Sequence, residues 1–450
     1  MALLKEISFR GGVAKDNSEL AARPRWTDSD RIRFRHGLPE KIGGWQKYIS
    51  TGFDGICRGM LSWLAADSIP RLCLGTHKRL YVVEGDNYHT ITPIRDSGTL
   101  ATNPFAATIN STSITVTHTL HGVAVDDYVT FAGATIFAGV TIDGEYQVTQ
   151  VTDANTYVIS HSVSATATAV GGGAAVTYEY PLGVGLVDGG RGYGWGVGGY
   201  GSGTYGTAAA TGIVFPPRVW SIWQWGQYIV ACPINGDIYQ WTLDTGVPAA
   251  VLANAPTSNK GIFVTDEKHL VALGAGGSPM KVEWCDQDDN TVWTPSDQNT
   301  AGGRTLVGGA EILFGIPARG SNLIFTDSSV WTMTFIGGLD VFGFRQVAAG
   351  ASGIIGPHAA ASAGGFVYWM GRSDFWVFDG AVREVPGSDE VRQYVFDNLS
   401  LDQAAKVFCF INSKFSEVWW VYPDGTENNR YVKYNWRERL WDLGRGKILT

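Results

Sequence analysis

A strand–turn–strand pattern recurs along the chain, and its clearest copy runs from residue 365 to residue 379. In that copy Phe366–Met370 and Phe375–Phe378 are apolar on both faces, and residues 371–374 have the composition of a turn. A strand that is apolar on both faces belongs inside stacked sheets, because neither face is favourably exposed to water. The pattern therefore predicts hairpins that are buried on both sides.

Five further copies of this pattern cover residues 71–83, 228–241, 269–284, 322–333 and 407–422. From Tyr239 onward their second strands lie roughly 40 to 50 residues apart, which is the period of four-stranded propeller blades. A hairpin cannot bury both faces alone, whereas hairpins stacked around a ring can. We therefore expect an all-β fold with a β-propeller-like body, and the 58 glycines among 450 residues fit many short strands joined by tight turns.

Composition divides the chain into four parts. Residues 1–98 hold an N-terminal segment and the first propeller blade. Residues 99–180 contain six acidic residues, no Lys or Arg, and short alternating strands, which predicts an inserted all-β accessory domain, a small barrel or sandwich. Residues 181–212 form a Gly/Tyr-rich loop, and residues 213–450 hold the remaining blades.

The whole chain is acidic, with a net charge of −8, which argues against a protein that wraps duplex DNA in a basic surface. No apolar run approaches the length of a membrane span, and the N-terminus lacks the apolar region of an export signal, so we expect a protein made in the cytosol without a membrane span. The five cysteines are scattered and form no CxxC motif, so neither a zinc site nor a disulfide framework is indicated.

Two groups of residues could suggest a metal, and neither has the required spacing. His118, His121 and His161 do not follow a zinc pattern. The run 286–290 begins like a calcium loop, but Thr291 replaces the glycine at position six and Asp297 replaces the glutamate at position twelve. We interpret this run as an acidic turn and expect no metal and no cofactor.

The N-terminal fifty residues are locally basic, with ten Lys and Arg against six Asp and Glu. Arg31, Arg33 and Arg35 alternate, so in a strand all three would share one face. One interpretation is a contact with phosphate or with an acidic partner. The other is a strand whose basic face is solvated or paired with neighbouring acids such as Asp30 and Glu40. We name the three arginines as candidate partner contacts.

The Gly/Tyr-rich loop supplies a second set of candidates. Its interleaved aromatic residues Tyr193, Trp195 and Tyr200 could contact another subunit, while glycine permits close backbone approach. The alternative is a long flexible loop without a partner. A phosphate-binding loop is disfavoured, because no strand–turn–helix context surrounds the glycines.

One helix is predicted, from Ser388 to about residue 405. Ser388 can cap it, Asp389 and Glu390 suit its first turn, and Val391, Val395 and Leu399 would bury one stripe.

No catalytic motif is found in the sequence. It has neither the Gly-x-Ser-x-Gly turn of hydrolases nor the His-Glu-x-x-His motif of metalloproteases, so we expect a protein that is not an enzyme. Carboxylate pairs of glycosidases are defined in space and not by spacing. A carbohydrate-binding or carbohydrate-cleaving β-propeller therefore stands as the alternative.

Three stretches together resemble one family: residues 26–45, residues 284–296, and residues 415–423 with 430–436. They are similar to the tail hub or nozzle proteins of short-tailed bacteriophages, also called packaged-DNA stabilisation proteins. The first and third stretches are the more specific. The inserted residues 99–180 look like β-modules that decorate phage structural proteins.

The resemblance implies a virion protein of the phage tail, made in the host cytoplasm, with a propeller-like fold. It implies a homo-oligomeric ring, a hexamer, below the portal and its adaptor protein and in contact with other tail proteins. That ring would retain packaged DNA and conduct it during ejection without reading its sequence. The family offers no catalytic residues to carry over.

Overall fold

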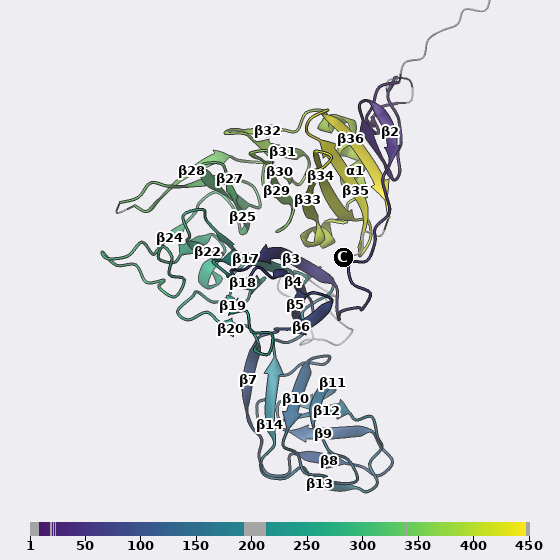
Figure 1. Ribbon diagram of the computed structural model, residues 1–450, viewed down its shortest axis with the longest axis vertical. Helices are drawn as coiled ribbons and strands as arrows, with labels where there is room; N and C mark the ends of the chain where they lie inside the picture. Colours follow the sequence, from purple (N-terminus) through teal and green to yellow (C-terminus); the bar gives the residue numbers. More distant parts are fainter. Residues whose placement is uncertain are drawn as a thin grey trace, which may run out of the picture.

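The computed structural model describes residues 9–446, apart from residues 19, 21, 23, 193–212 and 339. Six four-stranded antiparallel sheets lie around a ring as the blades of a propeller, and an eight-stranded sheet projects from it (Figure 1). Within each blade the spatial order of the strands follows the sequence, so every blade is one continuous stretch of chain. The predicted all-β fold, with a propeller-like body and an inserted β domain, is confirmed.

The blades are numbered in chain order. Blade 1 contains β3 (Cys57–Leu64), β4 (Pro70–Thr76), β5 (Leu80–Glu84) and β6 (Asn87–Thr90). Blade 2 contains β17 (Trp220–Trp225), β18 (Tyr228–Pro233), β19 (Tyr239–Trp241) and β20 (Ala250–Val251). Blade 3 contains β21 (Gly261–Val264), β22 (Leu270–Leu273), β23 (Lys281–Trp284) and β24 (Gly302–Thr305).

The second half of the ring follows without a break. Blade 4 contains β25 (Ile312–Ala318), β26 (Ser321–Thr326), β27 (Val330–Phe335) and β28 (Phe342–Ala348). Blade 5 contains β29 (Ala360–Ala363), β30 (Phe366–Met370), β31 (Phe375–Phe378) and β32 (Val382–Glu384). Blade 6 contains β33 (Phe408–Asn412), β34 (Glu417–Pro423), β35 (Asn428–Asn435) and β36 (Leu440–Arg445).

Five of the six repeated sequence patterns form the second and third strands of a blade. The neighbouring blades cover both faces of these strands. The sixth pattern instead matches the first and second strands of blade 6. There the third strand carries Arg430 and Lys433, which interrupt its apolar character. These charged residues therefore hid the equivalent pair of strands from a search for apolar hairpins.

Large side chains fill the spaces between neighbouring blades. Trp220 of blade 2 is fully buried and lies on blade 1, where a Cβ atom at Gly75 would overlap its indole ring. Its indole N–H donates to the carbonyl oxygen of Thr76, 2.8 Å away. Hydrophobic burial of this kind supplies the main force that holds sheet against sheet.

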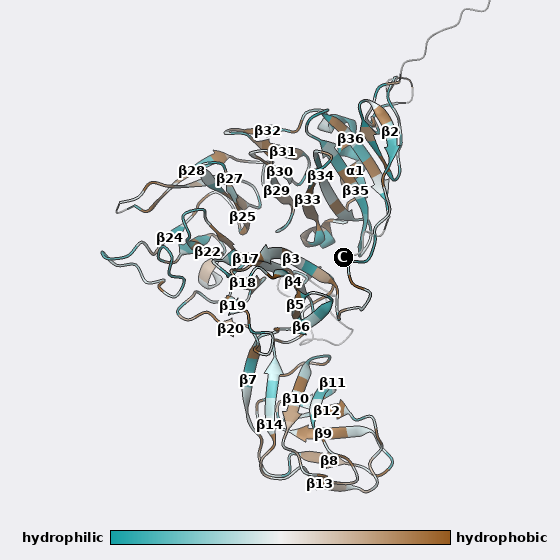
Figure 2. Ribbon diagram, in the orientation of Figure 1, coloured by the Kyte–Doolittle hydropathy of each residue, from teal (hydrophilic) through white to brown (hydrophobic). Residues whose placement is uncertain are grey.

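The inserted sheet has the strand order β13-β8-β9-β12-β11-β10-β14-β7 and curls into a half-barrel. Figure 2 shows hydrophobic colour along β8, β9 and β10, whereas β14 is mostly hydrophilic. The strands are β7 (Ile94–Thr99), β8 (Phe105–Ala107), β9 (Ser113–Thr117), β10 (Tyr128–Ala132), β11 (Gly144–Asp153), β12 (Thr156–Ser160), β13 (Ala169–Gly171) and β14 (Thr177–Pro181).

The inserted sheet begins at Ile94, inside the stretch that composition assigned to the first blade. Its first strand, β7, pairs with its last strand, β14. Since β7 still carries Arg95 and Asp96, the loss of basic residues after residue 98 marks a change of composition and not the start of the sheet.

Short elements lie outside the blades. The hairpin of β1 (Ile32–Arg35) and β2 (Leu38–Lys41) lies beside β36 on the outside of blade 6 (Figure 1). The pair β15 (Gly190–Gly192) and β16 (Ile213–Phe215) flanks the undescribed residues 193–212.

The predicted helix from Ser388 to about residue 405 is wrong as one element. It is divided into η2 (Ser388–Glu390), α1 (Arg392–Asn398) and η3 (Leu401–Lys406). The first break lies at Val391, with φ of −132° and ψ of −10°, and the second at Leu399 and Ser400, which are extended. Ser388 makes no side-chain cap. The carboxylate of Asp16 instead accepts hydrogen bonds from the backbone N–H groups of Gln393 and Tyr394. The other short helix is η1 (Ala275–Gly277), and no helix among the described residues is long and apolar enough to cross a membrane.

Candidate functional site

The structure separates the three candidate arginines of the N-terminal segment. Arg33 is buried: its Nε lies 3.0 Å from Glu417 Oε1, and its guanidinium lies 3.4 Å from the ring centroid of Phe415 in blade 6. The side chain therefore belongs to the interior of the fold and is not on the accessible surface. The expectation that all three arginines share one strand face is wrong, because Arg31 precedes β1 and has a left-handed backbone with φ of 56°.

Arg31 and Arg35 remain on the surface, with side chains that are 76% and 57% exposed. Each lies 3.8 Å from a neighbouring carboxylate, Asp30 for Arg31 and Glu40 for Arg35. Exposed pairs at this distance are weak and can exchange partners at low cost. The partner contact therefore stays a prediction, and the geometry limits it to these two arginines.

Four buried charges join the N-terminal segment to blade 6, and we call them the clasp cluster: Arg33, Glu417, Lys433 and Asp442. Lys433 Nζ lies 3.6 Å from Glu417, 3.0 Å from Asp442, and 2.6 Å from the carbonyl oxygen of Ile32. Burial lowers the pKa of Lys433 and raises the pKa of Asp442, and the opposite charges counter both shifts. Positive and negative side chains alternate in this cluster, so each buried charge is stabilised by the opposite charges beside it.

We expect Glu417→Gln to lower the free energy of unfolding by about 3 to 5 kcal/mol, because it leaves Arg33 and Lys433 buried without a shared carboxylate. Thermal and urea unfolding of the full chain measure this change. The matched control is Glu40→Gln, which removes an exposed carboxylate and should cost less than about 1 kcal/mol. Equal effects of the two variants would contradict a stabilising role for the clasp cluster.

The contact between blades 1 and 6, which we call the seam, differs from the other blade contacts. Among the described residues, no single buried apolar cluster spans these two blades. Residues 42–53 occupy the seam instead. Trp45 makes edge contacts with Phe410 and Trp419 of blade 6, and Ile49 joins the buried cluster on blade 1.

A second group of charges bridges the seam. Glu427 of blade 6 lies 3.1 Å from Arg58 of blade 1 and 3.4 Å from Lys406. Lys406 Nζ is fully buried and also lies 2.5 Å from Asp188. Gln403 exchanges two hydrogen bonds with the backbone of Gly189. The seam is therefore held by ion pairs and by the chain that leaves the inserted domain.

Glu427→Gln should loosen the seam, because it removes the carboxylate shared by two buried cations. We expect hydrogen exchange in β3 and β33 to become roughly tenfold faster, the equivalent of about 1.4 kcal/mol. Mass spectrometry of the full chain measures this exchange. The control is Glu384→Gln, an exposed carboxylate on blade 5; unchanged protection in the Glu427 variant would show that the ion pairs do not hold the seam.

The candidates Tyr193, Trp195 and Tyr200 lie outside the described residues. The described chain immediately before them is fixed at the seam through Asp188 and Gly189. The prediction that they contact a partner stays untested.

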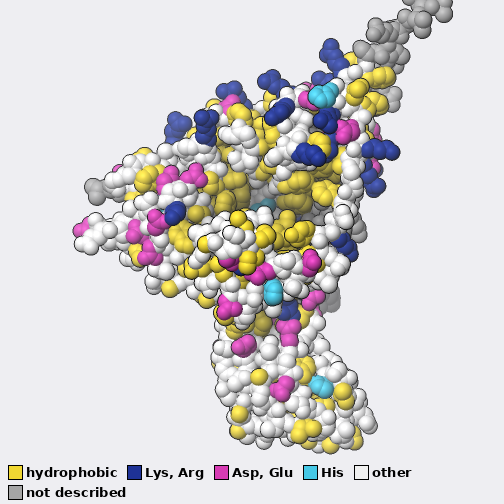
Figure 3. Space-filling model, in the orientation of Figure 1, with side chains coloured by type: hydrophobic (Ala, Val, Ile, Leu, Met, Phe, Trp, Pro, Cys, Tyr) yellow, Lys and Arg dark blue, Asp and Glu magenta, His cyan; other side chains and the backbone are white. Residues whose placement is uncertain are grey.

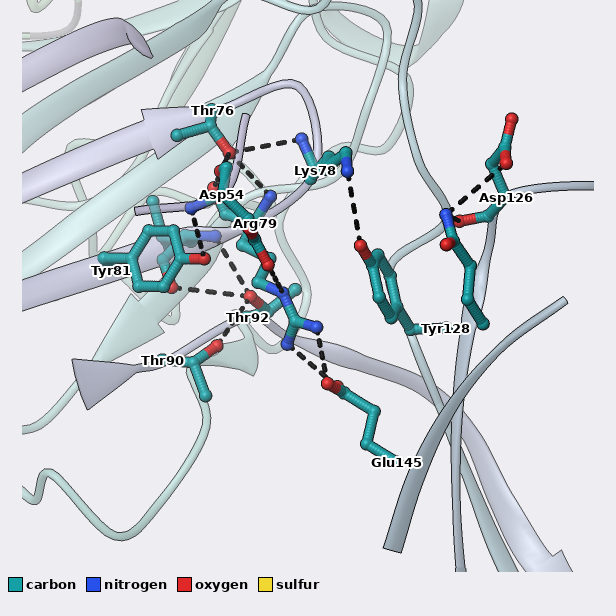
Figure 4. Close-up of polar contacts among 12 residues, drawn as sticks. Asp54, Thr76, Lys78, Arg79, Tyr81, Thr90, Thr92, Asp126, Tyr128 and Glu145 are labelled. Atoms are coloured by element: carbon teal, nitrogen blue, oxygen red, sulfur yellow. Dashed lines mark hydrogen bonds and ion pairs between the residues drawn. The ribbon is translucent and has the colours of Figure 1, made fainter. Parts of the chain in front are cut away.

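The inserted domain is held to blade 1 by a compact polar joint (Figure 4). Arg79, at the turn between β4 and β5, makes two hydrogen bonds of 2.8 and 2.6 Å to the carboxylate of Glu145. Its guanidinium lies 4.2 Å from the ring centroid of Tyr128, whose hydroxyl is 3.3 Å from Lys78 Nζ. A bidentate pair has a defined direction, so the joint fixes how the domain leaves the ring.

A groove of about 550 Å³ lies between blades 4 and 5, and sequence reasoning missed it. Arg319 and Arg345 line it from blade 4, and Phe366 and Asp379 line it from blade 5. These residues are up to 60 positions apart and share no spacing. The sequence offered one signal: a glycine stands next to Arg319, to Phe366 and to Asp379. Such glycines mark turns, and a turn without a side chain leaves open space at the surface.

The histidines considered for zinc have other partners. His118 Nδ1 lies 2.7 Å from the hydroxyl of Tyr180, and His121 Nε2 lies 2.9 Å from the carbonyl oxygen of Asp153. Asp286, in the acidic turn, accepts hydrogen bonds from the backbone and hydroxyl of Thr300. Within the described part of the chain, no three His, Cys, Asp or Glu side chains are grouped to hold a metal.

No protein-family model matches the chain, and no curated protein matches it. Among solved structures, it is similar to the phage phi92 endosialidase, with 11% identity and a TM-score of 0.20 over 82% of this chain and 51% of that one. A puromycin hydrolase is 12% identical, with a TM-score of 0.39 over 98% of this chain and 52% of that one. The chain spans about half the length of these two proteins. At such TM-scores the likeness carries no argument about function.

Proposed function

We propose that this protein is a structural subunit of the tail hub or nozzle of a short-tailed phage. It assembles as a homo-oligomeric ring, a hexamer, beneath the portal and its adaptor protein. In the virion the ring retains packaged DNA and conducts it during ejection. The subunit is made in the host cytoplasm and contacts other tail proteins, and its role is not enzymatic.

One observation carries the proposal. The two most specific stretches of the family resemblance are residues 26–45 and residues 415–423 with 430–436. They are about 400 positions apart and lie against each other. Arg33 lies on Phe415 and pairs with Glu417, while Trp45 contacts Trp419. Residues that carry a resemblance together are expected to form one structural unit, and here they form the clasp that attaches the N-terminal segment to blade 6.

The axis of a single propeller is not free for DNA. His358, which precedes β29 of blade 5, has its Nε2 2.9 Å from the carbonyl oxygen of Trp220 in blade 2, across the ring (Figure 1). Its own carbonyl accepts from the backbone N–H of Cys409 in blade 6. Because these contacts join three blades at the centre, the proposed DNA path runs through the channel that several copies enclose.

A non-enzymatic role fits the histidine geometry. His269 Nε2 lies 3.1 Å from Thr300 Oγ1, an arrangement that could resemble an activated hydroxyl. However, His269 is fully buried, and Thr300 Oγ1 also lies 2.6 Å from Asp286. Thr300 is half-buried, and its hydroxyl already donates to Asp286 and accepts from the backbone N–H of Gln287, 2.8 Å away. These bonds assign the pair to holding the loop of blade 3.

The mass of the full chain in solution tests the proposal, measured by mass photometry alone and with purified portal and adaptor proteins of the same phage. We expect a species of six times the 48.6 kDa chain mass, alone or on the adaptor. Images of the particles should show an open ring. A monomer under every condition, without binding to the adaptor, would contradict the proposal.

The same assay tests the exposed arginines. Arg31→Ala combined with Arg35→Ala should weaken assembly several-fold and leave thermal stability unchanged, because both side chains are exposed. Arg372→Ala, at an exposed arginine of blade 5, is the matched control. Unchanged assembly of the double variant would exclude these arginines as the partner contact without excluding a ring.

A further inference from the structure

The groove between blades 4 and 5 has the charge of an anion site. Arg319 follows β25 at its turn, Arg345 lies on β28, and both are exposed. Neither has a carboxylate within 4.0 Å among the described residues, in contrast to Arg383, which lies 3.5 Å from Asp379. Figure 3 shows Lys and Arg side chains gathered along the edge formed by blades 4, 5 and 6, while acidic side chains gather over the other blades. Two unpaired guanidinium groups beside one groove favour a ligand that carries a carboxylate or a phosphate.

Aromatic surface lies beside the arginines. Phe366 is 40% exposed at the start of β30, and Phe344 lines the groove from blade 4. A side chain at Gly365 would lie in contact with Arg319, so the glycine leaves space between the arginine and Phe366. An aromatic face next to an open rim is a surface on which the apolar face of a ring can stack.

The groove also contains groups that suit hydroxyls. The carboxylate of Asp379 can accept hydrogen bonds, and Thr334 has a hydroxyl that makes no hydrogen bond among the described residues. The hydroxyls of a sugar can donate to this carboxylate, whereas the phosphate group of a diester has no donor to offer it. The volume of about 550 Å³ lies within the range of small-ligand sites.

We propose that this groove binds a carboxylated saccharide. Arg319 and Arg345 bind the carboxylate, Phe366 stacks on the sugar ring, and Asp379 accepts from its hydroxyls. This site does not require the proposed oligomer, since all the residues that line the groove belong to one chain. It would give the protein a function in contacting an acidic glycan, in addition to its proposed structural role.

Isothermal titration of the full chain tests the proposal, with oligosaccharides of galacturonate, glucuronate and N-acetylneuraminate as probes. The methyl esters of the same oligosaccharides are the matched ligands, because esterification removes the charge and adds only a methyl group. At least one acid should bind, and its ester should bind at least tenfold more weakly. Absence of binding to all three acids at millimolar concentration, or equal binding of acid and ester, overturns the proposal.

Variants of the full chain locate the site. Arg319→Ala and Arg345→Ala should each weaken binding of the acid about tenfold. Phe366→Ala should weaken binding of acid and ester alike. Arg372→Ala removes an exposed arginine from the turn between β30 and β31, away from the groove residues, and should change nothing. If the groove variants bind like the control, or if duplex DNA or an acidic peptide binds more tightly at the groove than any saccharide, the proposal is wrong.

Discussion

The closure of the ring is the constraint on which the rest of the structure depends. Every blade is one continuous stretch of chain, so no strand from one end of the sequence completes the blade at the other end. Blades 1 and 6 must therefore be joined by other means, namely residues 42–53, the clasp cluster and the ion pairs of Arg58, Glu427 and Lys406. Apolar clusters join the other neighbouring blades directly, whereas the seam depends on residues 42–53 and on buried charges. Such charges are stable only as a complete set.

The sequence was sufficient for the repeated hairpins because a strand that is apolar on both faces, such as Phe366–Met370, has few other places in a fold. It failed for Arg33, since the burial of that side chain depends on Phe415 and Glu417, which no local pattern connects to it. The helical stripe of Val391, Val395 and Leu399 is buried as expected. The helix nevertheless stops at Asn398, because the next two residues are extended and the backbone N–H of Ser400 donates to the carbonyl oxygen of Pro423 in blade 6. The groove could not be predicted, because its two sides belong to different blades.

The inserted domain shows how such a ring can carry an addition without distortion. Its first and last strands, β7 and β14, pair with each other, so the chain leaves and re-enters the ring at neighbouring points. The bidentate contact of Arg79 with Glu145 then sets the direction of the domain. Blades 1 and 2 still pack through Trp220 as if they were consecutive.

The clasp also has a consequence for synthesis on the ribosome. Ile32 accepts a hydrogen bond from Lys433, which is made 401 residues later. At roughly 5 to 20 residues per second, the N-terminal segment waits about 20 to 80 seconds for its partner. During that time the nascent ring is open, and the flank of blade 1 that faces the seam has no neighbour. The same segment could instead bind blade 6 of another nascent copy on the same message, which would be a domain swap. The rate of translation and the spacing of ribosomes would then decide whether each propeller closes with its own N-terminal segment or with that of a neighbour.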